Sequence, residues 1–137
     1  MKSDAAQITS YYLTYLQDLH NALNQMIVTD RDARKLTQEH GLLEWCRMCH
    51  EAKLAGNTMY FVGNGASATM ASHMAADFSK NCDCRAMAFN DIAMITAVSN
   101  DIHYDDCFAV PLARFATAGD ILITVSSSGN SPNVLKA

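Results

Sequence analysis

The segment Ile121–Val125 leads directly into Ser126–Ser131, and this junction strongly constrains what the chain can fold into. The first segment is apolar, β-branched and bounded by polar residues, which predicts a buried strand. In an open parallel sheet, ligands bind beyond the carboxyl ends of the strands, against the next helix. Hydroxyls and free backbone N–H groups make an uncharged anion cradle there, and a helix N-cap needs only one of these hydroxyls. The segment therefore predicts an anion-binding loop.

A second loop of the same kind lies upstream. The apolar segment Thr58–Val62 runs into Gly63–Ser67, and a helical pattern follows from about Ala68 to Ser79. A strand, a glycine turn and a helix in this order let the backbone approach a phosphate closely. The loop lacks the Gly-Lys-Ser/Thr of a Walker loop and the third glycine of the dinucleotide fingerprint, so no nucleotide is expected. Two serine-bearing loops predict one shared site at the carboxyl edge of the sheet.

Composition narrows the class of protein. The 137 residues are 50% hydrophobic, which suffices for one core and predicts one domain. The net charge of −4 disfavours binding to a nucleic-acid backbone. No apolar run is long enough to span a membrane, and no signal-peptide core follows the first residues, so a cytoplasmic protein without membrane partners is expected.

The five cysteines fit a reducing compartment, because their number is odd and they form no secreted framework. Cys46 with Cys49, and Cys82 with Cys84, could be drawn as a four-thiolate zinc site. The first pair falls within a helical pattern, whereas zinc ribbons place their ligands in tight loops. Free, partly buried thiols are the favoured interpretation.

The first 56 residues predict a helical arm. Apolar residues recur at three- and four-residue steps up to about Val28, which is typical of a long amphipathic helix. Thr29 or Asp30 is placed to cap a second helix that runs toward Ala55, with an irregularity at Gly41. Gly56 is expected as the left-handed residue that ends it. Tyrosines lie on more than one face of the first helix, which favours packing on a partner subunit and hence a homo-oligomer.

Strands and helices alternate beyond the arm. The predicted order is strand 58–62, helix 68–79, strand 85–89, a helix capped by Asp91 up to about Ser99, a loop at 100–101, a helix through Phe108 to Ala116, and strand 121–125. This alternation predicts a parallel sheet with helices on both faces. A short helix opens at Ser131-Pro132 and leads to no further strand, so we expect an incomplete or truncated α/β domain.

Several motifs together resemble the SIS (sugar isomerase) domain family, most closely its phosphoheptose isomerase branch. They are Gly63–Ser67, His73 on the following helix, Ser99–Asp101 and Ser126–Ser131. The resemblance implies an α/β fold, a flavodoxin-like three-layer sandwich with a parallel sheet. It implies a single SIS domain over 1–137, with the helical arm at 1–56 and the α/β core at 57–137. It also implies a homo-oligomer, usually a tetramer, joined through the N-terminal helices.

The resemblance also assigns roles to residues. The phosphate of a sugar phosphate would be held by Ser126, Ser127, Ser128 and Ser131. Sugar hydroxyls would meet Asn64, Gly65, Ala66 and Ser67, and the substrate would also meet Asn100 and Asp101. Many members hold a zinc ion with a histidine and a glutamate four residues later, and that glutamate is the proposed base. The matching positions here are His73 and Asp77.

His73 and Asp77 stand four residues apart on a predicted helix, so both project from one face. An imidazole and a carboxylate suit a divalent metal, and they equally suit proton transfer between adjacent sugar carbons. Taken without the resemblance, the same pair is an ordinary surface pair worth a few tenths of a kcal/mol. The resemblance favours the site.

Three departures from the family pattern bear on activity. Asp77 replaces the glutamate and withdraws the carboxylate by one methylene, and a misplacement near 1 Å can cost about a hundredfold in rate. Ala66 replaces a glycine, which the loop tolerates if the backbone there keeps a negative φ. The family also carries a C-terminal glutamine and histidine, and no residue here can be matched to them.

Two functions from different classes follow from this sequence. The first is an isomerase that converts sedoheptulose 7-phosphate to D-glycero-D-manno-heptose 7-phosphate for surface-sugar biosynthesis (lipopolysaccharide or capsule). The alternative is a non-catalytic SIS module that binds a phosphosugar or a protein partner such as the replication initiator. A regulatory domain fused to a DNA-binding helix-turn-helix is disfavoured, because the arm has no basic recognition helix. The isomerase is the favoured hypothesis.

Overall fold

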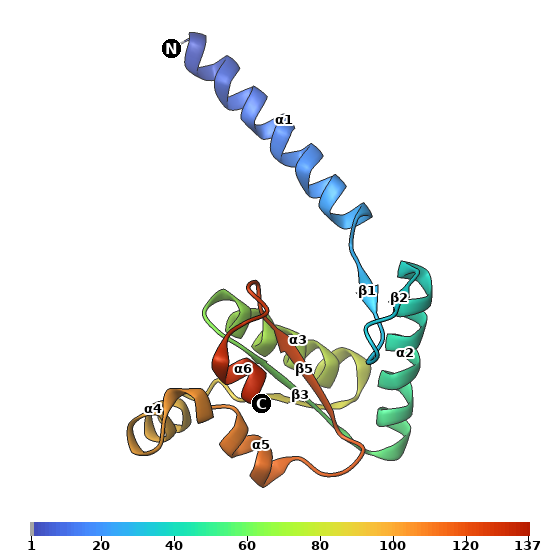
Figure 1. Ribbon diagram of the computed structural model, residues 1–137, viewed down its shortest axis with the longest axis vertical. Helices are drawn as coiled ribbons and strands as arrows, with labels where there is room; N and C mark the ends of the chain where they lie inside the picture. The colour runs from blue at the N-terminus through green and yellow to red at the C-terminus, as the bar shows by residue number, and fades with distance from the viewer. Residues whose placement is uncertain (1) are drawn as a thin grey trace. The chain divides into compact units, whose positions relative to one another are not determined.

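A computed structural model describes residues 2–137, with side chains from Asp4 onward (Figure 1). Contacts divide the chain into two units, one that extends up to Cys46 and one from Arg47 to Ala137. Helix α2 (Gln38–Ala55) contributes residues to both units. The assignment of 1–137 to a single domain stays a prediction.

The first unit begins with helix α1 (Lys2–Asn24), which confirms the predicted helix but ends four residues before Val28. The side-chain amide of Gln38 lies over this end and donates to the carbonyls of Asn24 and Met26 at 3.0 and 3.1 Å. Carbonyls at a helix end have no partner within the helix, so this amide stabilises the stop. The apolar side chains along α1 are exposed in this chain.

Residues 28–36 form a two-stranded ribbon, so the helix predicted to start at Thr29 or Asp30 is wrong there. Strand β1 (Val28–Thr29) pairs antiparallel with β2 (Lys35–Leu36). The Asp30 carboxylate accepts the backbone N–H groups of Asp32 and Arg34, both at 2.9 Å. Aspartate makes such local bonds in a turn as readily as at a helix cap, which explains the error.

Helix α2 begins one residue after Thr37, whose hydroxyl accepts the N–H of His40 at 3.2 Å. The helix passes through Gly41 without a break, contrary to the predicted irregularity. A Cβ at Gly41 would collide with the side chain of Val28, so the glycine lets the ribbon pack closely on the helix. Gly56 has φ +72°, as predicted for the residue that ends α2.

The second unit is built on a three-stranded parallel sheet with the order β4-β3-β5. The strands are β3 (Thr58–Gly63), β4 (Arg85–Ala88) and β5 (Ile121–Val125), which confirms the three predicted strands. Strand β3 is central and pairs with both neighbours. Five of its six residues are buried, as expected for a strand covered on both faces.

The connections are helical, also as predicted. They are α3 (Ala66–Cys82), α4 (Ile92–Asp101), a 3-10 turn η1 (Tyr104–Asp106), α5 (Ala109–Phe115) and α6 (Pro132–Lys136). The Asp91 carboxylate caps α4 by accepting the N–H of Met94 at 2.9 Å. The loop predicted at Asn100 and Asp101 is wrong, because both residues lie in the last turn of α4.

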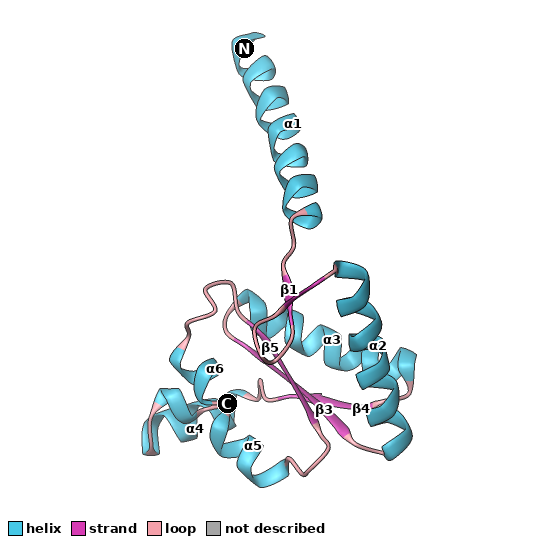
Figure 2. Cartoon of the chain, turned by 45° about the vertical axis from the view of Figure 1, so that its right-hand side comes forward, coloured by secondary structure: helices cyan, strands magenta, loops and turns pink. Residues whose placement is uncertain are grey.

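Helices cover both faces of the sheet (Figure 2), and an apolar core lies on each face. Met59 and Phe61 of β3 pack with α3 and the end of α2, while Tyr60 and Val62 pack with α4, α5 and α6. Alternate residues of a strand point to opposite faces, so this one strand supplies both cores. The result is the predicted three-layer α/β sandwich.

Across the part of the chain that the structure describes, no helix combines the length and apolar character needed to cross a lipid bilayer.

Candidate functional site

The glycine loop (Gly63–Ser67) and the serine loop (Ser126–Ser131) leave the sheet side by side. Strands β3 and β5 are parallel neighbours, and their last paired residues are Gly63 and Val125. Each loop therefore begins at the same level of the carboxyl edge, one strand spacing of about 4.8 Å apart. The structure thus brings together two loops whose sequences are separated by 58 residues of intervening chain.

The glycine loop turns tightly into α3. Gly65 has φ +55°, a conformation that favours glycine, whereas Ala66 opens the helix and is not among the positive-φ residues. The replacement of the family glycine by Ala66 is therefore tolerated by the backbone. A Cβ on Gly63 would lie 2.8 Å from the backbone of Ser67, so this glycine permits the close turn.

The serine loop binds its own backbone. The Ser126 hydroxyl accepts the N–H of Gly129 at 3.1 Å, and the Ser128 hydroxyl accepts the N–H of Asn130 at 3.2 Å. A hydroxyl that accepts one bond still has its own proton to donate. Ser127 and Ser128 are exposed, and Ser131 occupies the N-cap position of α6 without a side-chain capping bond. The loop can therefore direct hydroxyl donors toward an anion.

A cluster of polar side chains joins these loops, and the sequence analysis named only one of its members, Asn64. Asn64 and Asn133 exchange two amide hydrogen bonds, from Asn64 Nδ2 to Asn133 Oδ1 at 2.9 Å and from Asn133 Nδ2 to Asn64 Oδ1 at 2.8 Å. The Tyr104 hydroxyl donates to the same Asn64 oxygen at 3.0 Å. Asn133 also approaches the sulfur of buried Cys107 at 3.3 Å. The identity of Asn133, two residues after Ser131, was the one available signal.

Asn90 is a second missed residue, at the carboxyl end of β4. Its amide nitrogen donates to the carbonyl of Ala68 and to the hydroxyl of Ser72, both at 2.7 Å. These bonds fasten the first turns of α3 to the end of the neighbouring strand. Asn90 thus helps to fix the glycine loop from the side opposite the serine loop.

Asn100 and Asp101, predicted to touch substrate, are exposed at the end of α4 and bond to each other at 2.8 Å. Their contact with the loops is indirect, through Tyr104 a few residues later. His103 caps η1 by accepting the N–H of Asp105 at 3.2 Å. The structure therefore brings this segment to Asn64 by way of a tyrosine rather than through the predicted pair.

His73 and Asp77 pair on the outer side of α3, with His73 Nε2 3.3 Å from Asp77 Oδ2. Asn81 Nδ2 also donates to this carboxylate, at 3.1 Å. The two side chains are 77% and 40% exposed, so neither is held in an apolar pocket. The pair lies two to three turns along α3 from the glycine loop, and both of these contacts are made within the helix.

The donor geometry of this pair fits half of a tetrahedral zinc site. Two ligands about 2.0–2.1 Å from zinc lie roughly 3.3–3.4 Å apart at a tetrahedral angle. The observed separation of 3.3 Å matches that value. Among the described residues, however, no group of three or more His, Cys, Asp or Glu side chains is arranged to hold a metal ion.

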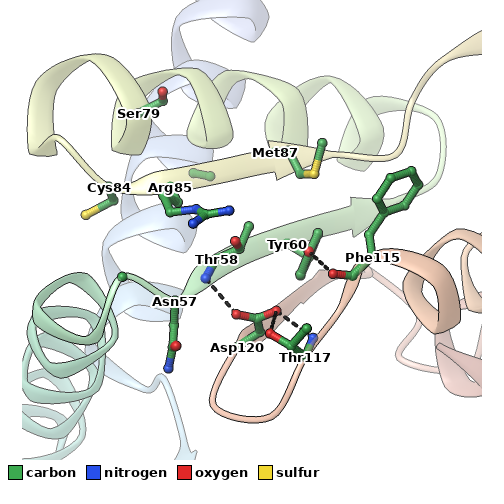
Figure 3. Close-up of a pocket in the computed structure, with 12 residues that line it drawn as sticks. Asn57, Thr58, Tyr60, Ser79, Cys84, Arg85, Met87, Phe115, Thr117 and Asp120 are labelled. Atoms are coloured by element: carbon green, nitrogen blue, oxygen red, sulfur yellow. Dashed lines mark hydrogen bonds between the residues drawn. The ribbon is translucent and has the colours of Figure 1, made fainter.

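A cavity of about 580 Å³ opens at the other, amino-terminal end of the strands (Figure 3). Asp120 lies in its wall, and its carboxylate accepts the backbone N–H groups of Thr58 and Thr117, each at 2.7 Å, and the Thr117 hydroxyl at 3.1 Å. These bonds, from Thr58 first, hold the pKa of Asp120 below its ordinary value of 3.8. The Asp120 carboxylate therefore joins β3 to the segment before β5 at this end of the sheet.

The fold and the two loops define a parallel α/β protein with a hydroxyl-rich candidate ligand site at the carboxyl edge of its sheet. The chain belongs to the SIS domain family, whose sequence profile matches residues 15–137.

Named relatives point to one branch of the family. The phosphoheptose isomerase of Shewanella sp. (strain ANA-3) is 33% identical over 128 residues, which cover 89% of this chain and 64% of the relative. That of Thermodesulfovibrio yellowstonii is 42% identical over 88 residues, covering 60% of this chain and 44% of the relative. The chain thus spans less than two thirds of the length of these relatives.

Solved structures are similar in fold. Phosphoheptose isomerase GmhA from Neisseria gonorrhoeae matches with a TM-score of 0.77 at 23% identity, over 96% of this chain and 65% of that one. A phosphoheptose isomerase from Francisella tularensis matches with the same TM-score at 24% identity and the same coverage. At this identity the likeness establishes the fold and confirms the predicted SIS architecture.

Proposed function

We propose that this chain is the SIS part of a phosphosugar isomerase, with sedoheptulose 7-phosphate and D-glycero-D-manno-heptose 7-phosphate as its substrate pair. The observation that carries the proposal is the register of Gly63 with Val125, which sets the glycine and serine loops side by side. One loop offers hydroxyl donors suited to a phosphate, and the other offers the close backbone approach suited to a sugar. The isomerase names of the relatives support the reaction class.

The proposed reaction moves a proton between adjacent sugar carbons. A base removes the proton next to the carbonyl, an enediolate forms, and the proton returns to the neighbouring carbon. Asp77 is the proposed base, and His73 is the proposed carrier of the proton that passes between the two oxygens. The exposed pair would have to be covered by substrate or a partner for these charges to act strongly, because water weakens them.

A zinc ion fits the proposal as a ligand of His73 Nε2 and an oxygen of Asp77, with the remaining positions filled by other donors. When bound, zinc would polarise the carbonyl and hydroxyl oxygens of the sugar. Equilibrium dialysis would test the site without any activity assay. A His73→Gln variant is expected to bind zinc at least about tenfold more weakly, because one of two protein ligands is lost.

The exposed apolar face of α1 supports a homo-oligomer, proposed as a tetramer. Ile8, Tyr12 and Leu23 are 57–68% exposed although they repeat with helical spacing. A second copy of the same helix is the proposed cover, in a cytoplasmic assembly. Light scattering of a Leu16→Glu/Leu19→Glu variant should give a smaller mass than the wild type. A Gln17→Glu/Asn21→Glu variant adds the same charge on polar positions and should keep the wild-type mass.

The reaction is tested by deuterium uptake from heavy water into sedoheptulose 7-phosphate, with and without zinc. Uptake at the carbon next to the carbonyl reports proton abstraction even when net turnover is slow. Asp77→Asn should abolish the uptake, whereas Asp77→Glu should raise it by restoring the reach of the family side chain. Asp83→Asn is the matched control, because it removes a carboxylate that is 99% exposed at the end of the same helix. Equal uptake in the Asp77→Asn and wild-type chains would refute the role of Asp77.

Phosphate binding is tested separately, by calorimetry with the phosphosugar. Replacing Ser127 and Ser131 together with alanine should weaken binding by about 2–4 kcal/mol, because each serine donates to a charged group. An unchanged dissociation constant would place the phosphate elsewhere. Phosphosugar binding without any deuterium uptake would instead favour the non-catalytic alternative, which gains no support from the relatives named above.

A further inference from the structure

The side chain of Asn64 is the meeting point of three loops at the carboxyl edge of the sheet. Asn64 itself follows β3 in the glycine loop. Asn133 reaches it from the helix after the serine loop, and Tyr104 reaches it from the segment after α4. Asn64 belongs to the glycine loop and Asn133 follows directly on the serine loop, and these are the two loops to which the proposed function assigns the phosphosugar.

The Asn64–Asn133 pair has a chemistry that few side chains can reproduce. Each amide both donates to and accepts from the other, at 2.8 and 2.9 Å. Aspartate at either position would set a carboxylate oxygen against the oxygen of the other amide. Leucine at position 133 would remove both amide bonds and leave Asn64 with the Tyr104 hydroxyl as its side-chain partner. Asn133 is 1% exposed, so water cannot replace the lost bonds at low cost.

The Asn64–Asn133 pair lies at the edge of one core, beside Cys107, and links the glycine loop to the start of α6. Asn133 stands in the first turn of a helix of only five residues, next to the core residue Val134. Its bonds go to the glycine loop and to Cys107 and not to its own helix. The pair is therefore a direct side-chain connection between the glycine loop and the helix that follows the serine loop.

We propose that Asn133 is a positioning residue that holds the glycine loop at a fixed distance from the serine loop, acting through Asn64. The inference rests on the proposed function and deepens it. A phosphosugar must place its phosphate on one loop while its hydroxyls meet the other. Inorganic phosphate needs the serine loop alone. Loss of Asn133 should therefore weaken phosphosugar binding and leave phosphate binding intact.

The role of the Asn64–Asn133 pair in holding the glycine loop is tested first without any ligand, by hydrogen exchange of the backbone amides of Asn64–Ser67. An Asn133→Leu variant should exchange these amides at least about fivefold faster than the wild type, because the glycine loop loses two hydrogen bonds. Val134→Ala is the matched control, since it destabilises the same helix through the core and leaves the amide pair in place. Equal acceleration in both variants would reduce Asn133 to a structural residue and refute the proposal.

The functional consequence is tested by calorimetry with two probes, inorganic phosphate and sedoheptulose 7-phosphate. For Asn133→Leu we expect the dissociation constant of the phosphosugar to rise about tenfold and that of phosphate to stay within about twofold. In a turnover assay, kcat should fall more than KM rises, because the reacting carbons are misplaced. Equal weakening of both probes, or of neither, would overturn the proposal.

If Asn133→Leu does not fold, a second variant, Tyr104→Phe, tests the role of Asn64 instead. Tyr104→Phe removes one hydrogen bond to Asn64 from a half-exposed ring. It should weaken phosphosugar binding about threefold and spare phosphate binding. No change in either probe would refute the role of Asn64 as the meeting point.

The two proposals fail in different ways. A wild-type chain that binds phosphate but no phosphosugar would refute the proposed function, and the ligand-free exchange measurement would still decide whether Asn133 holds the glycine loop.

Discussion

Asp120 offers a sharp test of how the sheet is held at its amino-terminal end. Its carboxylate accepts three hydrogen bonds, one from Thr58 at the start of β3 and two from Thr117 before β5. Asp120→Asn keeps the size of the side chain but turns one oxygen into an NH₂ group. If the remaining oxygen faces Thr58, the NH₂ group faces the two Thr117 donors and both of those bonds are lost.

The expected cost follows from these contacts. A hydrogen bond to a charged group contributes about 1.5–3 kcal/mol to stability when it is shielded from water. Asp120 is only half-buried, so its bonds contribute less. We therefore expect the free energy of unfolding to fall by about 1–3 kcal/mol at pH 7, or the Tm to fall by roughly 3 °C per kcal/mol. Urea unfolding at fixed protein concentration measures this change. Asp83→Asn removes an exposed carboxylate and should stay within about 0.5 kcal/mol of the wild type.

The dependence on pH separates charge from shape. The folded pKa of Asp120 lies below 3.8, so the unfolded chain binds more protons near that pH, and stability rises with pH there. The contribution is complete above about pH 5 and is lost as the pH falls through 3.8 toward the lower folded pKa. The difference between the wild type and Asp120→Asn should shrink over the same interval. A difference that stays constant down to pH 3 would refute the electrostatic explanation.

Two further substitutions test packing in each unit. Gly41→Ala should lower the free energy of unfolding by about 1–2 kcal/mol despite the higher helix propensity of alanine, because the new Cβ would collide with the side chain of Val28. Adding Val28→Ala should restore part of this loss, and additive effects of the two substitutions would contradict the collision between the two side chains. Tyr60→Phe should lower the free energy of unfolding by about 1–2 kcal/mol, because it removes the 2.8 Å hydrogen bond from the buried Tyr60 hydroxyl to the carbonyl of Phe115. Thermal unfolding measures this change, and an unchanged Tm would show that the hydrogen bond contributes nothing to stability.

The sheet and its helices could be predicted because their signals are local. Strands β3 and β5 are short apolar runs that end at glycine or serine, and Asp91 precedes α4 in a clear capping position. Residues 28–36 could not be predicted in the same way. The carboxylate of Asp30 satisfies backbone N–H groups equally well in a helix cap and in a turn, and the closeness of Val28 to Gly41 decides between them only in three dimensions.

The candidate site was predictable in its loops but not in their connections. The serines and the glycines could be recognised because each group follows directly on an apolar segment that predicts a strand. The amide pair of Asn64 and Asn133 joins residues 69 positions apart, and no sequence period encodes such a contact. Asn100 and Asp101 were placed in a loop because asparagine and aspartate favour turns, yet α4 extends through both. The roles of all these residues in substrate binding stay predictions.

The position of β3 between two cores has a consequence for how such chains change over time. Met59 and Phe61 touch one set of helices, while Tyr60 and Val62 touch the other. A volume change at Phe61 can be compensated by α3, with no adjustment of the layer behind the strand. In related sequences, the positions of Met59 and Phe61 should therefore covary with one group of helices. The positions of Tyr60 and Val62 should covary with the other group, and the two sets should vary independently of each other. Insertion of one residue into β3 would exchange the two sets at once, which makes length the property of this strand that is least free to vary.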